Sequence, residues 1–305
     1  MNFIVTTLLG LLAISAPVKN TPIDSIPFVV EKDNRIYTYL KVNNTDSLYF
    51  LIDTGASDMV INANHLSKVN MEFDAKAANM GAAGQSEVAL STNNRVVWGQ
   101  HETQPLEFIA IPFPGAKWDG VLGLSLMKQF VVEINYSDKR IYLYDKRSYN
   151  NPSANRLKIS YAHGVPVVPV SVKTADEKTR ELRLELDTGS DRVLDLNTSY
   201  VNQHNLLAIY PRPFAKSTVS GSDGNTGTIL EDYFTQVNLS NFELYRIPGG
   251  LAQIPFGIMN STEIDGVLGN LLLKRFNLIF DFERNYLYLT PNNYIHSPFY
   301  SFLLD

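Results

Sequence analysis

One short motif occurs twice in this chain, and the repeat limits the possible folds more than any other feature. Asp-Thr-Gly begins at Asp53 and again at Asp187, 134 positions later, each time at the end of an expected strand. A Gly-Val-Leu-Gly element follows each motif, beginning at Gly120 and at Gly266, 146 positions apart. The order is therefore the same in both halves. Because two copies are too few for a solenoid, the repeat predicts two similar lobes.

Local patterns indicate β structure in both halves. Leu48–Ile52 is a continuous apolar run, typical of a strand covered on both faces. In the second copy Arg183 and Glu185 alternate with leucines, so we expect a half-exposed strand. The other expected elements are partner strands at 36–42 and 165–172, turns at 43–47 and 174–178, and helices of about two turns at 124–130 and 270–276. The predicted fold class is all-β, with two lobes related by a pseudo-two-fold axis and a short helix in each.

The N-terminus has the pattern of an export signal, with an apolar segment at 3–14 followed by small residues. That segment is too short to span a bilayer. A buried first strand or helix is the alternative, because no Lys or Arg precedes the segment. A polar stretch at 147–156, interrupted by proline, predicts the linker between the lobes. The expected division is a signal peptide at 1–15, an N-terminal linker at 16–27, and lobes at 28–150 and 151–305.

Composition excludes several other classes of protein. The chain has 305 residues and no cysteine, so an exported form must depend on buried apolar cores rather than disulfides. Its net charge of −5 comes without a basic patch or a stacking motif, so we expect no nucleic-acid partner. The five histidines lack metal-ligand spacing. We expect no metal, no cofactor and no integral membrane segment, and an exported (secreted or periplasmic) monomer.

The duplicated aspartate suggests a chemistry. If the lobes face each other, Asp53 and Asp187 meet at their interface. Two neighbouring carboxyl groups share a proton, because both cannot ionise readily. One can then act as general base on a water while the protonated one polarises a peptide carbonyl. Gly55 and Gly189 carry no Cβ and would let backbone amides come close to the carboxylates.

These motifs resemble the aspartic protease superfamily, which includes pepsins and retroviral proteases. The resemblance spans residues 28–290 and rests on both Asp-Thr-Gly motifs, each with a downstream Val-Leu-Gly, at 121–123 and 267–269. It implies an aspartic endopeptidase that holds an extended peptide or protein substrate in the cleft between the lobes. The residues to which it assigns roles are the catalytic Asp53 and Asp187, Thr54 and Thr188, which lock the two loops together, and the supporting Gly55, Gly189 and Ser190.

Two glycine-rich segments, 79–86 and 220–227, are the candidate flaps over the cleft. Gly81, Gly84 and Gly221 are accordingly our candidate substrate-binding residues in them. Plain hairpin turns are the alternative. Pepsin-like enzymes place a tyrosine on the flap, and the first segment has none, so a flap in each lobe would look more like a retroviral protease.

Other positions distinguish the chain from its apparent relatives. Asp191 matches an acid that contacts substrate in retroviral proteases, but Asn270 stands where its arginine partner would be. Ser190 can donate a hydrogen bond to Asp187, whereas Ala56 cannot do so for its own aspartate. We therefore expect Asp187 to have the lower pKa and Asp53 to be protonated more readily. The expected working range is about pH 4 to 6.5.

Two rival functions use the same residues. The first is a peptide-binding protein of the same fold without catalysis, which would normally have lost one aspartate. The second is a two-carboxylate glycosidase, a class in which nothing requires a repeated Asp-Thr-Gly. Asp119 and Asp265 also repeat, and we interpret them as turn formers. The endopeptidase is the function that the sequence favours.

Overall fold

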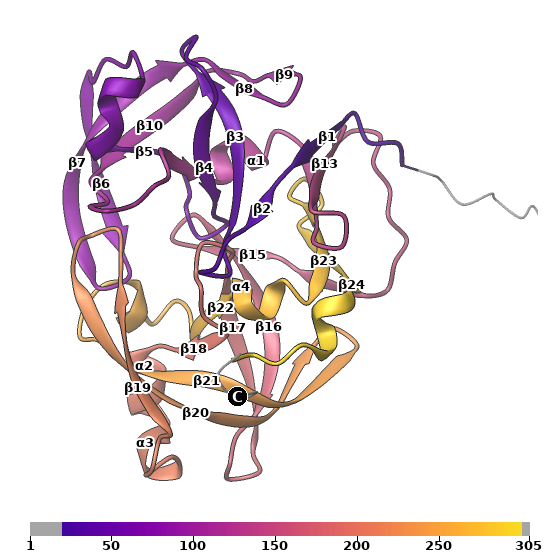
Figure 1. Ribbon diagram of the computed structural model, residues 1–305. Coiled ribbons are helices and arrows are strands. Elements are labelled where there is room, and N and C mark those ends of the chain that lie inside the picture. Colours follow the sequence, from indigo (N-terminus) through magenta and orange to yellow (C-terminus); the bar gives the residue numbers. More distant parts are fainter. Residues whose placement is uncertain (1–19, 301–305) are drawn as a thin grey trace, which may run out of the picture.

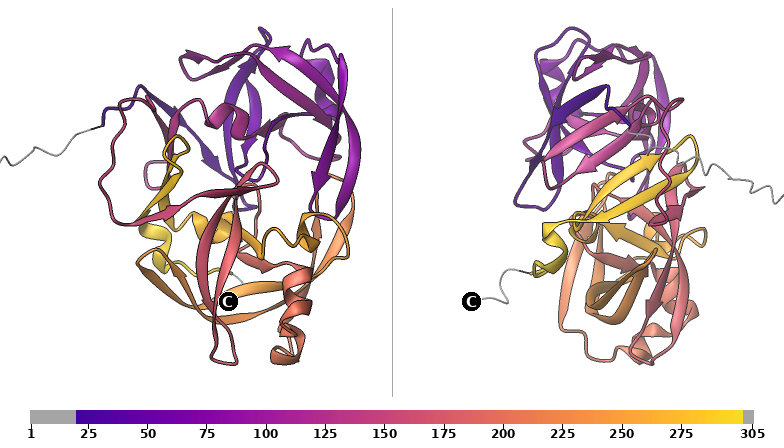
Figure 2. Two further views of the ribbon diagram at one scale, coloured as in Figure 1. Left: turned by 180° about the vertical axis from the view of Figure 1, so that it is seen from behind. Right: turned by 90° about the vertical axis from the view of Figure 1, so that its right-hand side faces the viewer.

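The computed structural model describes residues 20–300 and is nearly all-β, which confirms the predicted fold class. The N-terminal half lies at the top of Figure 1 and most of the C-terminal half at the bottom, and the side view in Figure 2 separates the same two bodies. The expected signal peptide at 1–15 lies outside the described residues, as does the tail from 301. Between residues 20 and 300, no helix is long and apolar enough to cross a membrane.

The N-terminal lobe is built on one ten-stranded sheet. In spatial order its strands are β6 (Ala75–Gly81), β7 (Gly84–Asn94), β10 (Leu106–Ile111), β5 (Met59–Asn62), β11 (Gly120–Leu122), β4 (Leu48–Ile52), β3 (Ile36–Val42), β8 (Val96–Trp98) and β9 (His101–Glu102), with β2 (Val29–Val30) paired to β3. The predicted strands at 36–42 and 48–52 are confirmed as β3 and β4.

The C-terminal lobe repeats this arrangement in an eight-stranded sheet. Its strands in spatial order are β15 (Ser160–Ala162), β16 (Val165–Lys173), β17 (Thr179–Asp187), β22 (Gly266–Gly269), β18 (Leu194–Leu196), β21 (Phe242–Gln253), β20 (Thr226–Leu239) and β19 (Ala215–Ser220). The order β3-β4-β11-β5-β10-β7-β6 in the first lobe corresponds strand by strand to β16-β17-β22-β18-β21-β20-β19 in the second. The lobes are thus two copies of one topology.

A third sheet joins the lobes and shows their symmetry. Its order is β1 (Asp24–Pro27), β13 (Arg140–Tyr144), β12 (Val131–Asn135), β23 (Phe276–Asp281), β24 (Tyr286–Pro291) and β14 (Arg156–Lys158). At its centre Glu133 pairs with Ile279, the residue 146 positions later, and the flanking pairs are Val132 with Phe280 and Ile134 with Leu278. Leu278 and Phe280 are the residues 146 positions after Val132 and Ile134. A two-fold rotation therefore exchanges the two flanking pairs, and its pseudo-two-fold axis passes between Glu133 and Ile279.

The same sheet bears on the predicted division of the chain. Residues 24–27, which we assigned to an N-terminal linker, form β1 and pair with β13. The stretch expected to link the lobes, 147–156, lies between β13 and β14 and reaches the first residue of β14, so the lobe boundary after residue 150 falls inside a connection.

The helices are short. They are α1 (Leu124–Met127), α2 (Thr198–Gln203), α3 (Leu206–Ile209) and α4 (Asn270–Leu273), with 3₁₀ helices η1 (Ala63–Lys68), η2 (Ile258–Asn260) and η3 (Asn293–His296). The prediction of two helical turns after each Gly-Val-Leu-Gly is wrong, because α1 and α4 are each a single turn. The chain must leave each of them to enter β12 or β23 in the shared sheet.

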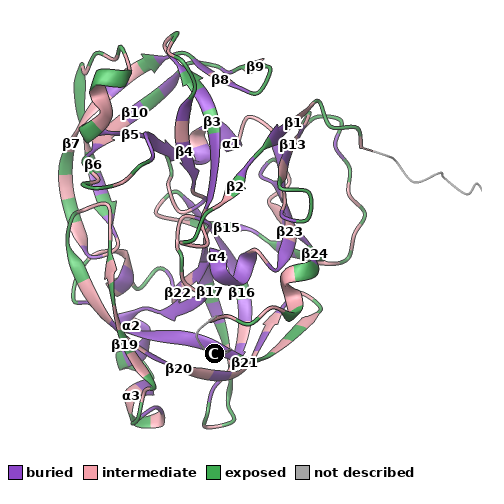
Figure 3. Cartoon of the chain, viewed as in Figure 1, coloured by how far each residue is buried: buried purple, intermediate pink, exposed green. Residues whose placement is uncertain are grey.

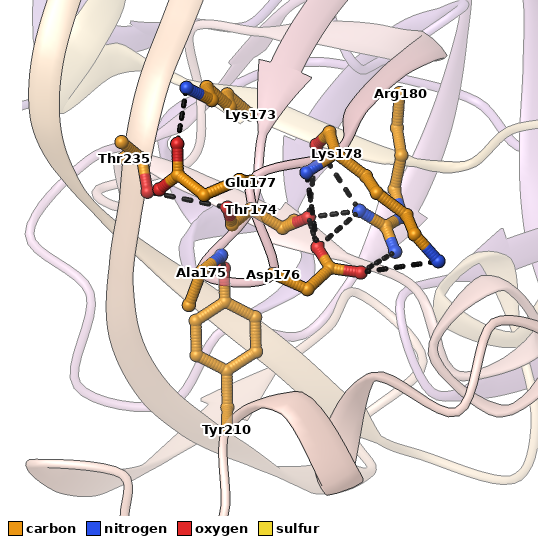
Figure 4. Close-up of polar contacts among 9 residues, drawn as sticks. All are labelled: Lys173, Thr174, Ala175, Asp176, Glu177, Lys178, Arg180, Tyr210 and Thr235. Carbon is orange, nitrogen blue, oxygen red and sulfur yellow. Dashed lines mark hydrogen bonds and ion pairs between the residues drawn. The ribbon is translucent and has the colours of Figure 1, made fainter.

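The turn between β16 and β17 fixes the pairing of these two strands (Figure 4). The carboxylate of Asp176 accepts a hydrogen bond from the Thr174 hydroxyl (2.6 Å) and pairs with Arg180 (2.9 Å). The hydroxyl of Tyr210, beyond α3, accepts the Ala175 amide (3.0 Å). This network confirms the predicted turn at 174–178 and holds β17, the strand that carries the second Asp-Thr-Gly.

Buried side chains run from one lobe into the other as a single apolar cluster. Figure 3 shows buried residues along β22 and the adjoining part of β17, in the middle of the molecule. Trp98 and Trp118 are both buried. Each fully buried large apolar side chain contributes about 1.5 to 3 kcal/mol. A core of this extent allows the chain to fold without disulfides.

Candidate active site

Each Asp-Thr-Gly loop follows a strand in the interior of its sheet. Asp53 comes directly after β4, and Asp187 is the last residue of β17. In both lobes the Val-Leu-Gly strand runs parallel to that strand and antiparallel to the one after the loop. The first residue of the helix that follows each Val-Leu-Gly strand donates its backbone amide to the loop. Leu124 donates to the Ala56 carbonyl (2.9 Å), and Asn270 donates to the Ser190 carbonyl (2.9 Å). Both loops are therefore held from below by their own lobe.

Thr54 and Thr188 lock the two loops to each other. The Thr54 amide donates to the Thr188 hydroxyl oxygen (3.0 Å), and the Thr188 amide donates to that of Thr54 (3.1 Å). The two hydroxyls in turn donate to carbonyls of the opposite lobe, Thr54 to Leu186 (2.7 Å) and Thr188 to Ile52 (2.9 Å). Both threonines are fully buried. The four bonds are related by the pseudo-two-fold axis and place the loops face to face.

This lock brings the two aspartates into contact. The carboxyl groups of Asp53 and Asp187 hydrogen-bond to each other, and both residues remain partly accessible to solvent. Asp53 accepts the Gly55 amide (2.7 Å), and Asp187 accepts the Ser190 amide (2.9 Å). The arrangement is a pair of carboxyl groups that can share one proton and reach a bound molecule.

Both motif glycines are required by close approach rather than by a left-handed backbone. A Cβ on Gly55 would lie 2.8 Å from Cγ of Asp187, and a Cβ on Gly189 would collide with the carboxyl group of Asp53. Neither glycine has a positive φ. Each glycine thus makes room for the aspartate carboxyl group of the other lobe.

We expect Gly189→Ala to lower kcat/KM for peptide cleavage by about 100-fold, because the new methyl group must displace the carboxyl group of Asp53, and a shift of about 1 Å in a reacting group costs this much. The matched control is Ser190→Ala, which installs the residue that follows the glycine in the other loop. It should stay within about threefold of wild type, because its hydroxyl group touches neither aspartate in the structure. Equal activity of the two variants would contradict the prediction. The measurement is steady-state cleavage of one peptide by both variants.

The hydrogen bond on which the predicted order of the two pKa values rested is not among those that the described residues form. The Ser190 hydroxyl accepts the Arg192 amide (3.3 Å), and Asp187 receives the Ser190 backbone amide instead. Burial raises the pKa of Asp187 well above its ordinary value, and the negative charges of Asp53 and Glu185 raise it further. Burial also raises the pKa of Asp53, but a hydrogen bond from Asp187, the Gly55 amide and the charge of Arg35 counteract this. These surroundings raise the pKa of Asp187 further than that of Asp53 and so favour the shared proton on Asp187.

Glu185 is the site residue that we predicted wrongly. We expected it on the exposed face of β17, but it is 3% exposed. The alternation of β17 stops before the loop, because residues 184–186 are all buried there, where the opposite lobe covers the strand. Comparing the two motif copies would have shown the signal, since Leu51 occupies the corresponding place in the first copy.

Asp119 and Asp265 do more than form turns. Asp119 accepts the amide of Tyr49 in β4 (2.9 Å), and Asp265 accepts the amide of Arg183 in β17 (2.7 Å), which is the equivalent position 134 residues later. Each carboxylate thus holds the strand that leads to a catalytic loop.

The two glycine-rich hairpins meet at their tips. The β6–β7 hairpin of the first lobe and the β19–β20 hairpin of the second lie on one side of the molecule (Figure 1). The Asp223 carboxylate accepts the Ala83 amide across the lobes (3.0 Å). A Cβ on Gly81, Gly84 or Gly221 would come within 2.7 Å of an atom of the opposite hairpin. These glycines allow the contact between tips, whereas their predicted role in binding substrate stays a prediction.

We expect Asp223→Ala to open this contact. The substitution removes the acceptor of the Ala83 amide, and a partly exposed hydrogen bond to a charged group is worth about 1 kcal/mol or more. Amide exchange in 79–86, followed by hydrogen–deuterium mass spectrometry, should therefore rise about fivefold. Asp46→Asn, at an exposed site in the first lobe, provides the control. Unchanged exchange in the tip segment would show that the carboxylate does not hold the hairpins together.

Asp191 and Asn270 have separate surroundings. Asp191 is exposed, and its charge is among those that raise the pKa of Arg35 against the effect of burial, after Tyr37 and Asp33. Asn270 is fully buried and donates to the Asn34 carbonyl (2.6 Å). The asparagine therefore ties the lobes together. An arginine from the first lobe, Arg35, supplies the positive charge near Asp191, whose substrate-binding role stays a prediction.

Comparison with known proteins supports the class that this geometry indicates. Residues 38–126 match the family model described as aspartyl protease. That segment contains the first Asp-Thr-Gly loop and its Val-Leu-Gly strand, and the second lobe lies outside it. No curated protein matches the chain. The match supports a place in the aspartic protease superfamily and a protease-type function, with a peptide as the class of substrate.

Proposed function

We propose that this protein is an aspartic endopeptidase in which Asp53 and Asp187 activate a water molecule. The observation that carries the proposal is the pair of Asp-Thr-Gly loops, joined across the lobes by four threonine hydrogen bonds, with their carboxyl groups in contact. An inactive relative would not need to keep both carboxyl groups in this arrangement.

The pKa order assigns the roles. Asp53, the ionised member, accepts a proton from the water as its oxygen bonds to the peptide carbonyl carbon. Asp187 gives its proton to the carbonyl oxygen, which yields a gem-diol intermediate. The carbon–nitrogen bond then breaks as Asp53 passes its proton to the leaving amine, and a diol hydroxyl returns a proton to Asp187. The two carboxyl groups and one water account for every proton.

The hairpin tips offer a way to hold an extended substrate. Their meeting across the lobes favours the retroviral type of closure, with a flap from each lobe, over a single flap. A cavity of about 590 Å³ lies beside the tips and is lined by Met80, Gly84 and Phe256 among others. Met80 and Phe256 are exposed apolar side chains. We propose that the cavity accepts an apolar side chain of the peptide.

We also propose that the protein is exported to the periplasm or secreted and acts as a monomer, because each half of its active site comes from the same chain. The proposal of export rests on the signal peptide predicted at 1–15.

The test is cleavage of an unbiased peptide library at pH 4 to 7, with and without a statine-type inhibitor, which mimics the gem-diol. We expect cleavage that the inhibitor abolishes, and the cleaved sequences report the side-chain preference. Inhibitor binding without cleavage would instead indicate an inactive peptide-binding protein. Cleavage that the inhibitor leaves unchanged would overturn the role of the dyad.

A further inference from the structure

A third carboxyl group lies against the dyad. A Cβ built on Gly55 would be 3.0 Å from Oδ1 of Asp187 and 3.0 Å from Oε1 of Glu185, so both carboxyl groups face the same glycine of the opposite loop. Glu185 and Asp187 are two residues apart on β17 and hence lie on one face of the strand. Oε2 of Glu185 is buried and has no hydrogen-bond partner among the described residues.

Among residues 20–300, no positive charge compensates this group. The strand neighbours of Glu185 are Val167 of β16 and Val267 of β22. The charges that couple to it are those of Asp53 and Asp187, both of the same sign. The positive charge of Arg35 acts on Asp53.

Such a carboxyl group is held neutral. Burying an ionised carboxylate without a partner is costly, so the group keeps its proton instead. Burial and the charge of Asp53 raise the pKa of Glu185 to about 8. Three carboxyl groups this close lose their protons in steps that belong to the whole set. The corresponding position of the first lobe holds the buried Leu51, so the three-carboxyl arrangement breaks the two-fold symmetry.

We propose that Glu185 is a positioning residue that shares protons with Asp53 and Asp187 and keeps the dyad singly protonated up to neutral pH. This inference rests on the proposed endopeptidase function. Glu185 touches no reacting atom in the mechanism. It acts on Asp187 because the three groups lose protons as one set, so a proton lost from either Glu185 or Asp187 leaves a negative charge that makes the other proton harder to remove. The enzyme would thereby stay active above the range of a dyad with two carboxyl groups alone.

The first test compares the pH dependence of kcat/KM in wild type, Glu185→Gln and Glu185→Leu. Glu185→Leu introduces the residue that the first lobe has at the corresponding position. It provides a second test if the glutamine side chain of Glu185→Gln destabilises the fold. We expect the high-pH limb to move to lower pH, with kcat/KM at a pH on that limb about tenfold lower for each unit of the shift. The low-pH limb should stay in place, because Glu185 is neutral there. Glu181→Gln, at an exposed position of the same strand, should leave the profile unchanged.

The second test does not need activity and separates this proposal from the endopeptidase itself. Because the pKa of Glu185 is raised from 4.5 to about 8 on folding, the folded chain binds the extra proton, and wild type loses stability as pH rises through that window. The melting temperature of Glu185→Gln relative to wild type should therefore rise between pH 4.5 and 8. The proposal would be overturned if the difference in melting temperature between Glu185→Gln and wild type did not change with pH. It would also be overturned if the two proteins had the same pH profile of kcat/KM. An inactive protein that still shows the stability trend would refute only the endopeptidase.

Discussion

Replacing either dyad carboxyl group by an amide, as Asp53→Asn or Asp187→Asn, should lower kcat/KM for peptide cleavage by about 10³-fold or more. A positioned general acid or base contributes about 10² to 10⁴-fold, and the two groups act on one proton transfer. The loss from the double variant should therefore be close to that from either single one rather than their product. Steady-state cleavage of a peptide chosen from the library measures all three.

The fold should survive these substitutions, which makes the loss interpretable. Burial raises both dyad pKa values above 3.8, so the folded protein binds more protons than the unfolded chain and loses stability as pH rises from that value. Each asparagine removes this effect, so at pH 7 we expect melting temperatures equal to or above that of wild type. Asp46→Asn, exposed in the first lobe, should keep full activity. Dyad variants that stay within tenfold of wild-type activity would contradict the proposed mechanism.

Removing either lock hydroxyl should have the largest effect on stability. Thr54→Val and Thr188→Val keep the shape of the side chain but leave a buried amide and a buried carbonyl of the other lobe unpaired. An unsatisfied buried polar group costs about 1 to 3 kcal/mol, so each variant should lose about 3 kcal/mol in the free energy of unfolding. Urea denaturation measures this loss.

Thr54→Ser and Thr188→Ser are the matched controls, because serine keeps the hydroxyl group and loses one methyl. They should lose about 1 kcal/mol or less. The double valine variant should lose less than the sum of the singles, since both residues belong to one hydrogen-bonded network. Valine and serine variants of equal stability would show that the cross-lobe bonds contribute little.

Several features could be predicted from the sequence because they depend on local pattern. The strand at Leu48–Ile52 followed from its continuous apolar run, and the turn at 174–178 from its polar residues. The duplicated motif predicted two lobes of one topology, which the strand orders confirm. Pairing of Asp53 with Asp187 followed from that duplication, since equivalent residues next to a two-fold axis must meet.

Other features depend on what one segment packs against. Residues 24–27 carry no strong strand pattern, and their pairing with β13 makes them a strand. The one-turn helices α1 and α4 end early because the chain continues into the sheet shared by the lobes. Contact between the hairpin tips joins segments about 140 positions apart, a relation that no short stretch of sequence contains.

What the sequence by itself determined is the class of the site: two carboxyl groups, presented twice by the same motif in a two-lobed β fold. Only the tertiary structure decided which of them holds the proton. A pKa depends on burial and on every charge nearby, and at Asp187 burial is followed by the charges of Asp53 and then Glu185. The alternation of leucines with charged residues along β17 predicted that the Glu185 side chain is exposed, but the loop of the opposite lobe covers it. These surroundings favour the proton on Asp187, whereas comparison of Ser190 with Ala56 had assigned it to Asp53.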